Sequence, residues 1–310
     1  MTAISSGRPI LVTGSHRSGT TWIGQVLSTD RSVGYIHEPF SLLCPPGVFR
    51  FRVPYWYYHV TPETAGDAAR AFSDTLAFRF SYGADLGAMR GPRHALHLLV
   101  NASQFAFHRA LRHRPLVKDP LALLSAEWLA ETFGMDVLVS IRHPLGFVSS
   151  LVRMGWSFDF SDLLEQKLLM STLLQDSRED IEAAASSRDD VVLNTAVLWK
   201  VLHRVIAGYV ERHPEWLFVR YKDIANDPVK GFEPVFSRLQ LPFGARERKR
   251  IQYLSGSGNP EERPNDPRVT RVDSSALLKT VMLRLSESDR ERVREIVSPV
   301  AKIFFGNDEW

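Results

Sequence analysis

The sequence contains almost no cysteine. Cys44 is the only one among 310 residues, so a disulfide within the chain and a cysteine-based zinc or iron–sulfur site are both excluded. A chain without such cross-links suits a reducing compartment, and we expect it to be cytoplasmic.

Long apolar runs and charge of one sign are also scarce. The longest apolar runs, such as that within Val137–Ile141, have at most the length of a strand and are too short to span a membrane. The first residues lack the charged and apolar segments of a signal peptide, so no integral membrane association is expected. The 38 Lys and Arg residues barely exceed the 35 Asp and Glu residues. The nearest basic cluster, Arg246–Arg250, contains Glu247 and is interpreted as a solvated helix face, so we expect no nucleic-acid partner.

The rest of the composition is that of an ordinary globular protein, with 44% hydrophobic and 24% charged residues. Short apolar segments, which we interpret as strands, alternate with helical patterns. The expected strands cover residues 9–13, 35–36, 116–118, 137–141 and 216–221. This alternation predicts an α/β fold, with a central parallel sheet of about four to five strands flanked by helices, and with helical insertions. We expect one domain over residues 1–310.

The helical patterns have recognisable start signals. Thr61 followed by Pro62 is typical of a helix start, and a proline also stands at the start of two later patterns. The expected helices cover 20–27, 61–80, a segment ending near residue 111, 120–133, 144–150, 159–185 and 190–212.

The most informative segment, Gly14–Trp22, follows the first strand and has the sequence GSHRSGTTW. Its glycine-bounded loop passes from a strand directly into a helix. Such a loop aims backbone N–H groups and the positive helix end at one point, which can bind phosphate or sulfate. The alternative is an ordinary strand-to-helix turn, because glycine and serine are common there.

The cation in this loop is unusual in its position. Gly14 and Gly19 have the spacing of the nucleotide triphosphatase loop G-x-x-x-x-G-K-[ST], but Thr20 occupies the place of the lysine. The basic residue is Arg17 instead. A triphosphatase without its lysine lacks its main charge stabiliser, whereas a guanidinium can bind the oxyanions of a donor that needs no metal.

At this point the chain resembles a known family. The run Arg17–Trp22, RSGTTW, is similar to the 5′-phosphosulfate loop of the sulfotransferases that use 3′-phosphoadenosine-5′-phosphosulfate (PAPS). The family's second signature is an arginine after a central strand with a serine eight residues later, which binds the 3′-phosphate of the donor; Arg142 and Ser150 match it.

This resemblance implies a P-loop NTPase-like sulfotransferase fold, PAPS as the donor, 3′-phosphoadenosine-5′-phosphate as the product, and no required metal. The donor-binding residues that it implies are Arg17, Ser18, Gly19, Thr20, Thr21, Trp22, Arg142 and Ser150. As the resemblance further implies, a neutral SO₃ unit passes between two oxygens. Cations are then needed near the leaving phosphate, and a base near the acceptor hydroxyl.

The catalytic candidates follow from this chemistry. Arg17 is our first candidate for stabilising the leaving nucleotide, and Lys118, where the family places a strand-end lysine, is the second. Cytosolic members use as base a histidine two residues after that lysine, but this chain has Pro120 there. We therefore prefer Glu38 as the base, with His37 as its rival because its usual pKa suits the task. Alternatively, Glu38 pairs with Arg17 or Lys118 and only orients it.

Two further features each have two interpretations. Trp22 either stacks on adenine, as the family's tryptophan does at this position, or packs in the core. The late stretch 255–274 contains Arg263, Arg268 and Arg271. Arg268 and Arg271 are candidates for closing over the 3′-phosphate, as a late basic loop does in the family; ordinary surface charge is the alternative.

The acceptor site lies outside the donor motifs. We expect it to involve the aromatic stretch Phe49–Tyr58, the helix after it and the loop near Gly87. The acceptor itself is expected to be a hydroxyl of a small molecule, a sugar or a lipid headgroup, and the oligomeric state is not indicated. Two other functions compete with this one: a P-loop small-molecule kinase, and a non-catalytic nucleotide-binding module on the same fold.

Overall fold

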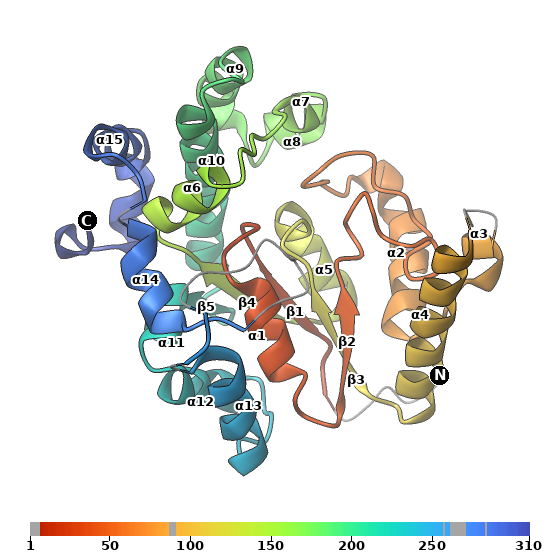
Figure 1. Cartoon of the computed structure of the whole chain (residues 1–310). Helices are drawn as coiled ribbons and strands as arrows, with labels where there is room; N and C mark the ends of the chain where they lie inside the picture. Colours follow the sequence, from red (N-terminus) through yellow and green to blue (C-terminus); the bar gives the residue numbers. More distant parts are fainter. Residues whose placement is uncertain (1–6, 87–90, 257, 261–270, 283) are drawn as a thin grey trace.

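Five parallel strands form one sheet in the middle of the protein (Figure 1). The computed structural model describes residues 7–86, 91–256, 258–260, 271–282 and 284–310. From one edge to the other, the strands are β2 (Val33–His37), β3 (Arg114–Lys118), β1 (Ile10–Gly14), β4 (Asp136–Ile141) and β5 (Leu217–Arg220). Each neighbouring pair is parallel. The expected α/β fold with a central parallel sheet is confirmed.

Strand β1 lies at the centre of the sheet, and all five of its residues are buried. Its register sets Leu11 beside Val117 of β3 and Val137 of β4. Successive side chains of a strand point to opposite faces. Accordingly, Ile10 and Val12 enter one hydrophobic core and Leu11 enters the other. A continuous apolar run is typical of a strand covered on both faces, which explains why this strand is recognisable in the sequence.

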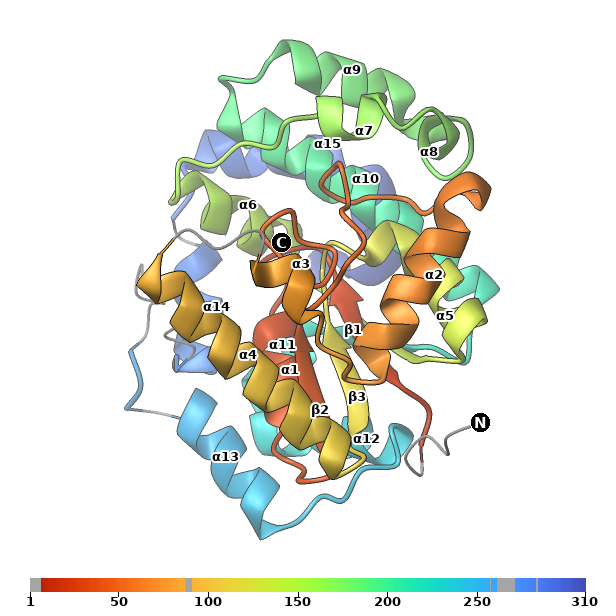
Figure 2. The same ribbon diagram turned by 90° about the vertical axis from the view of Figure 1, so that its right-hand side faces the viewer.

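Helices cover both faces of the sheet (Figures 1 and 2). The face that carries Ile10 and Val12 packs against α1 (Thr20–Leu27), α11 (Tyr221–Asn226), α12 (Pro228–Arg238) and α13 (Ala245–Ser255). The face that carries Leu11 packs against α5 (Ala126–Phe133), α6 (Pro144–Val152), α10 (Val191–Arg212) and α15 (Glu287–Phe304). The remaining elements include α2 (Pro62–Leu76), α3 (Tyr82–Leu86), α4 (Pro92–Ala110), α14 (Ser274–Met282) and a 3₁₀ turn at Asn307–Glu309.

The single helix expected over 159–185 is wrong. The segment instead forms α7 (Ser161–Leu164), α8 (Lys167–Ser171), a 3₁₀ turn at Gln175–Ser177, and α9 (Arg178–Ser186). Its buried Leu163, Gln166, Met170 and Leu174 keep the three- and four-residue spacing of one helical face, which explains the expectation, but the backbone is interrupted between the short helices. Gln166 sits between two of these helices, and its side-chain oxygen accepts from the backbone N–H of His59 at 2.8 Å.

The helix expected to begin at Pro120 also differs. A 3₁₀ turn, Leu123–Ser125, comes first, and α5 begins only at Ala126. The reason lies in Asp119, whose carboxylate accepts from the backbone N–H of Leu121 at 2.9 Å and of Phe40 at 2.6 Å. This carboxylate ties the chain after β3 to the chain after β2 instead of capping a helix.

Among the described residues, α10 is the one helix whose length and composition would suffice to cross a membrane. It packs against α6, α9 and α15, and its residues from Asn194 to Trp199 are buried. In this structure α10 is therefore a core helix.

Candidate functional site

The loop between β1 and α1 turns at two glycines with unusual backbone conformations. Gly14 has a φ of 137° and Gly19 a φ of 93°, values that residues with a side chain rarely adopt. A Cβ on Gly14 would lie 2.4 Å from the carbonyl oxygen of Ser140, and one on Gly19 would lie 2.6 Å from the ring of Tyr221. The loop can approach β4 and α11 this closely only because both residues are glycine.

Arg17 connects the two sequence signatures. Its Nε donates to Ser150 Oγ at 3.1 Å. In turn, Nη1 of Arg142 donates to the carbonyl oxygen of Arg17 at 2.8 Å, which holds that residue in a left-handed conformation with a φ of 64°. The loop after β1 and the junction between β4 and α6 thus form one cluster. Both guanidinium-bearing residues belong to it, at the carboxyl edge of the sheet, where open α/β folds bind ligands.

The start of α1 offers hydrogen-bond donors to an anion. The N–H groups in the first turn of a helix have no carbonyl partner within the helix, and no described side chain caps α1 to satisfy them. Ser15 Oγ and Ser18 Oγ are buried without a hydrogen-bond partner in the described part of the chain. Ser140 Oγ fixes the loop by donating to the carbonyl oxygen of Ser18 at 2.7 Å. Orphaned polar atoms at a positive helix end fit the phosphosulfate part of a donor nucleotide.

Arg142 is held by its surroundings. Its guanidinium carbon lies 4.8 Å from the ring centroid of Tyr221, and its carbonyl oxygen accepts from Trp199 Nε1 at 2.9 Å. Ser150, on α6, is buried. Arg142 and Ser150 both contact Arg17, and the half-buried cation of Arg142 is a second place where a phosphate could bind.

Lys118 and Glu38 meet where β3 and β2 end. The side chain of Lys118 is fully buried, and its ammonium group donates to a carboxylate oxygen of Glu38. The backbone N–H of Glu38 donates to the carbonyl oxygen of Lys118 at 2.9 Å. Glu38 is therefore paired with Lys118. The sequence left this pairing open as the alternative to a role of Glu38 as the base.

His37 lies apart from this pair. Its side chain is 61% exposed, and its Nε2 is 3.8 Å from a Glu38 oxygen. Its Nδ1 is 3.3 Å from the hydroxyl of Tyr35. Glu38 lines the cavity described next, whereas His37 is absent from its described lining.

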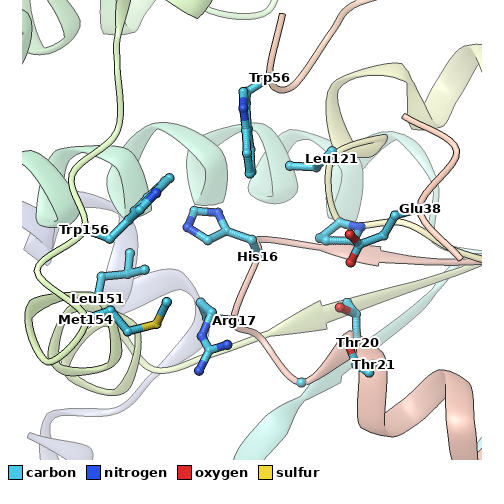
Figure 3. Close-up of a pocket in the computed structure, with 12 residues that line it drawn as sticks. His16, Arg17, Thr20, Thr21, Glu38, Trp56, Leu121, Leu151, Met154 and Trp156 are labelled. Carbon is cyan, nitrogen blue, oxygen red and sulfur yellow. The ribbon is translucent and has the colours of Figure 1, made fainter. Parts of the chain in front are cut away.

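Arg17 and Glu38 both line a cavity of about 230 Å³ (Figure 3). Its polar wall also contains the hydroxyls of Thr20 and Thr21. In Figure 3 the two indoles stand on the far side of His16 from these threonines. The apolar part of the lining consists of Trp56, Pro120, Leu121, Leu151, Met154 and Trp156. The cavity therefore brings the cation of Arg17, the carboxylate of Glu38 and an apolar wall together.

His16 is a member of this wall that sequence reasoning missed. Its backbone N–H donates to the hydroxyl of Tyr57 at 3.0 Å, and that hydroxyl is 2.6 Å from Nδ1 of the same histidine. A hydroxyl that accepts from the N–H is left to donate to Nδ1, which places the ring proton on Nε2. Burial, and then the charge of Arg17, lower the pKa of His16 to about 3, so the ring is neutral near pH 7. The only sequence signal was its place inside the loop.

The other candidates lie in different surroundings. Trp22 is 4% exposed and packs edge-on against Tyr221 and Phe232, at ring-centroid distances of 5.6 and 5.1 Å, which favours the core interpretation over adenine stacking. Arg271 donates to Asn259 Oδ1 at 3.0 Å and lies over the ring of Tyr253. Arg268 lies outside the described residues. Where the chain is described, no group of three metal-ligating side chains is found.

Comparisons with known proteins give likenesses at the level of structure alone. No family model and no curated protein matches this chain. Sulfotransferase STF9 from Mycobacterium avium is 15% identical, with a TM-score of 0.45, over 96% of this chain and 77% of that one. The sulfotransferase domain from the curacin biosynthetic pathway is 15% identical, with a TM-score of 0.44, over 96% and 99% of the two chains.

A sulfotransferase domain from the Synechococcus PCC 7002 olefin synthase is 14% identical, with a TM-score of 0.43, over 95% of this chain and 96% of that domain. At such identities and scores, these likenesses assign no role to any residue. The chain is similar along nearly its whole length to these three sulfotransferases and sulfotransferase domains.

Proposed function

We propose that this protein is a sulfotransferase that moves a sulfuryl group from PAPS to a hydroxyl group of an acceptor bound in the cavity. The observation that carries the proposal is the contact of Arg17 with Ser150, together with that of Arg142 with the Arg17 carbonyl. Two signatures more than a hundred residues apart in the chain meet around the uncapped start of α1. This is the cluster of cations and N–H donors that a nucleotide with two separate anionic groups requires.

The proposed roles follow from position. Arg17 and the first-turn N–H groups of α1 stabilise the negative charge that develops on the phosphate oxygen as its bond to sulfur breaks. Arg142 and Ser150 bind the 3′-phosphate, and Thr20 and Thr21 contribute hydroxyls to the wall beside Arg17. PAPS supplies the sulfuryl group and needs no metal for this transfer.

Glu38 is the proposed base. One of its carboxylate oxygens accepts from Lys118, and the residue lines the cavity. In the transfer, the acceptor hydroxyl forms a new bond to sulfur and gives its proton to Glu38. Lys118 keeps that carboxylate in place and adds positive charge near the leaving phosphate. Glu38 can therefore be both oriented and basic.

The cavity wall supports an acceptor with an apolar body. Trp56 comes from the aromatic stretch that the sequence marked as an acceptor region, and Trp156 and Leu151 come from the α6 end of the cavity. Indole and aliphatic walls bind flat or branched apolar groups, while Glu38 receives the polar end. We propose that the acceptor is a small-molecule alcohol or phenol, or a lipid or glycan hydroxyl carried on an apolar group.

Isothermal titration calorimetry with 3′-phosphoadenosine-5′-phosphate and with ATP plus Mg²⁺ separates the proposal from its rivals. A sulfotransferase binds the first nucleotide at least about tenfold more tightly than the second. Tighter binding of ATP with Mg²⁺ would favour a kinase and contradict the proposal. A panel of hydroxylated acceptors incubated with labelled PAPS then tests transfer. Tight binding of the desulfated nucleotide without any labelled product would favour a non-catalytic module.

A further inference from the structure

The junction between β4 and α6 determines where the guanidinium of Arg142 lies. β4 ends at Ile141 and α6 begins at Pro144, so Arg142 and His143 alone connect them. The backbone of such a junction lies outside the regular hydrogen bonding of a strand or a helix, and its polar groups need partners from elsewhere. The group that holds this backbone therefore also influences the position of the arginine side chain that it carries.

Trp199 holds this junction from the core helix α10. Its side chain is fully buried, and its Nε1 donates to the carbonyl oxygen of Arg142 at 2.9 Å. The N–H is the single polar group of an indole, and it can only donate. Because α10 packs against α6, this bond ties the end of β4 to a helix residue that is 57 positions further along the chain.

The indole of Trp199 is itself held by His203, one turn further along α10. The two rings stack with their centroids 3.9 Å apart and an angle of 14° between their planes. His203 Nδ1 is 2.9 Å from the carbonyl oxygen of Trp199, and since that oxygen can only accept, Nδ1 carries the proton. Burial lowers the pKa of His203 to about 3, so an uncharged imidazole packs against the indole near pH 7.

The hydrogen bonds continue from Arg142 into the loop after β1. Nη1 of Arg142 donates to the carbonyl oxygen of Arg17 at 2.8 Å, and Arg17 Nε donates to Ser150 Oγ at 3.1 Å. The backbone of Arg142 is therefore held by α10, while its guanidinium reaches the residues proposed to bind the donor. A cation that is already in place binds an anion more tightly, because its side chain need not be ordered when the ligand arrives.

We propose that Trp199 is a positioning residue for the 3′-phosphate of the donor. Its indole N–H fixes the carbonyl of Arg142, so that the guanidinium already lies against the Arg17 carbonyl when the nucleotide binds. This inference rests on the proposed function and deepens it, because it assigns part of the donor affinity to a buried residue that acts through Arg142. Without that N–H, the junction also adopts other arrangements, and the apparent affinity falls with the fraction of the protein that remains competent to bind.

Isothermal titration calorimetry of Trp199→Phe tests the proposal with two nucleotides. Phenylalanine keeps an aromatic ring but has no N–H. The Kd for 3′-phosphoadenosine-5′-phosphate should rise by about tenfold, as when the competent fraction falls to about one tenth. The Kd for adenosine 5′-phosphate, which has no 3′-phosphate, should change by less than about twofold. In an Arg142→Ala background, Trp199→Phe should have no further effect on either nucleotide, because the guanidinium that it positions is absent.

A second variant keeps the volume of the ring. Incorporation of benzothienylalanine at position 199 replaces the indole N–H by a sulfur atom, which cannot donate. It should raise the Kd for 3′-phosphoadenosine-5′-phosphate by the same factor of about ten. Because benzothiophene has nearly the size and shape of indole, this variant should fold even if Trp199→Phe does not, and circular dichroism verifies the folding of each.

Two control variants separate positioning from a general loss of packing. Tyr209, also on α10, is fully buried and its hydroxyl donates to the Leu123 carbonyl at 2.9 Å, so Tyr209→Phe removes a comparable hydrogen bond. Trp216 is buried just before β5 and stacks on His213 with ring centroids 4.3 Å apart, so Trp216→Phe removes the same ring volume as Trp199→Phe. Both controls should lower the urea midpoint of unfolding and leave the Kd for 3′-phosphoadenosine-5′-phosphate unchanged.

The possible results distinguish this inference from the proposed function. If the unchanged protein binds 3′-phosphoadenosine-5′-phosphate and both variants at position 199 bind it equally well, the positioning role is overturned and the proposed function stands. An equal rise in Kd in Tyr209→Phe or Trp216→Phe also overturns it, because packing alone then accounts for the effect. If the unchanged protein does not bind this nucleotide, the proposed function fails, and the role of Trp199 fails with it.

Discussion

The buried ammonium group of Lys118 donates to the carboxylate of Glu38, and the two residues also share a backbone hydrogen bond of 2.9 Å. Lys118 is the last residue of β3, and Glu38 directly follows the last residue of the neighbouring strand β2. His37 is in register with Lys118, which brings Glu38 to the end of β3. The pair places an oriented carboxylate at the wall of the cavity. A buried cation with a carboxylate partner is strongly constrained, since breaking such a pair leaves one charge uncompensated.

Replacing Glu38 with glutamine should abolish the proposed base and keep an oxygen that can accept from Lys118. We expect kcat to fall by about 10²- to 10⁴-fold, with little change in the affinity for 3′-phosphoadenosine-5′-phosphate. The acidic limb of the pH–rate profile should flatten. The control is His37→Gln, at a side chain 61% exposed, which should keep the profile of the unchanged protein. If His37→Gln loses that limb and Glu38→Gln retains it, the histidine is the base.

Arg17 and Arg142 should fail in different ways when each is replaced by alanine. Arg17→Ala removes charge from the leaving phosphate, so kcat should fall by about 10²- to 10³-fold, more than donor affinity does. Arg142→Ala should mainly raise the KM for PAPS, by about 10- to 100-fold, the range expected for a lost charge-assisted bond. Steady-state kinetics of both variants measure this split. Equal effects on KM in both variants would contradict the division of roles.

Gly19→Ala should destabilise the protein and weaken donor binding. The new Cβ would lie 2.6 Å from the ring of Tyr221, at a φ of 93°, and the strain should lower the free energy of unfolding by about 1–3 kcal/mol. Gly66→Ala is the matched control, because no atom lies within 4 Å of a Cβ built there. In the middle of α2 it should stabilise by about 0.5–1 kcal/mol. Urea unfolding of both variants measures whether the free energy of unfolding falls or rises in each. An equal decrease in both variants would contradict the argument.

Asp119 should make the protein less stable as the pH rises towards neutrality. Burial, and then the charge of Glu38, raise the pKa of this carboxyl to about 7, above the value of about 3.9 of an unfolded chain. The folded protein therefore binds more protons than the unfolded chain between these values. The favourable contribution is fully present below about pH 4 and is lost as the pH rises through about 7.

Urea unfolding of the unchanged protein and Asp119→Asn from pH 4.5 to 7.5 isolates this effect. The difference in their free energies of unfolding should change by up to about 1.4 kcal/mol per pH unit in that window. In the asparagine variant one of the N–H groups of Phe40 and Leu121 faces an amide NH₂ in place of an accepting oxygen, so the variant should also be less stable at low pH. A difference that stays constant with pH would contradict the raised pKa.

Elements that depend on local sequence were predictable. The continuous apolar run of β1 marks a strand covered on both faces, and α1 occupies the expected residues 20–27. The two glycines with Arg17 between them marked the tight loop between β1 and α1, because a positive φ and a close approach need glycine. In contrast, the segment over 159–185 has the burial spacing of one helix but forms several short ones, and its Gln166 hydrogen-bonds the backbone of His59 and Tyr57, far away in the chain.

The sequence alone therefore determined the class of the fold, the loop with its arginine, and the second signature of Arg142 and Ser150, since each depends on neighbouring residues or on strands of recognisable composition. Only the tertiary structure decided that Arg17 reaches Ser150, that Glu38 pairs with Lys118, and that His16 is held by Tyr57. It also decided that the indole of Trp199 donates to the Arg142 carbonyl. These relationships join residues far apart in the chain, and local patterns carry no information on which distant surfaces will meet when the sheet assembles.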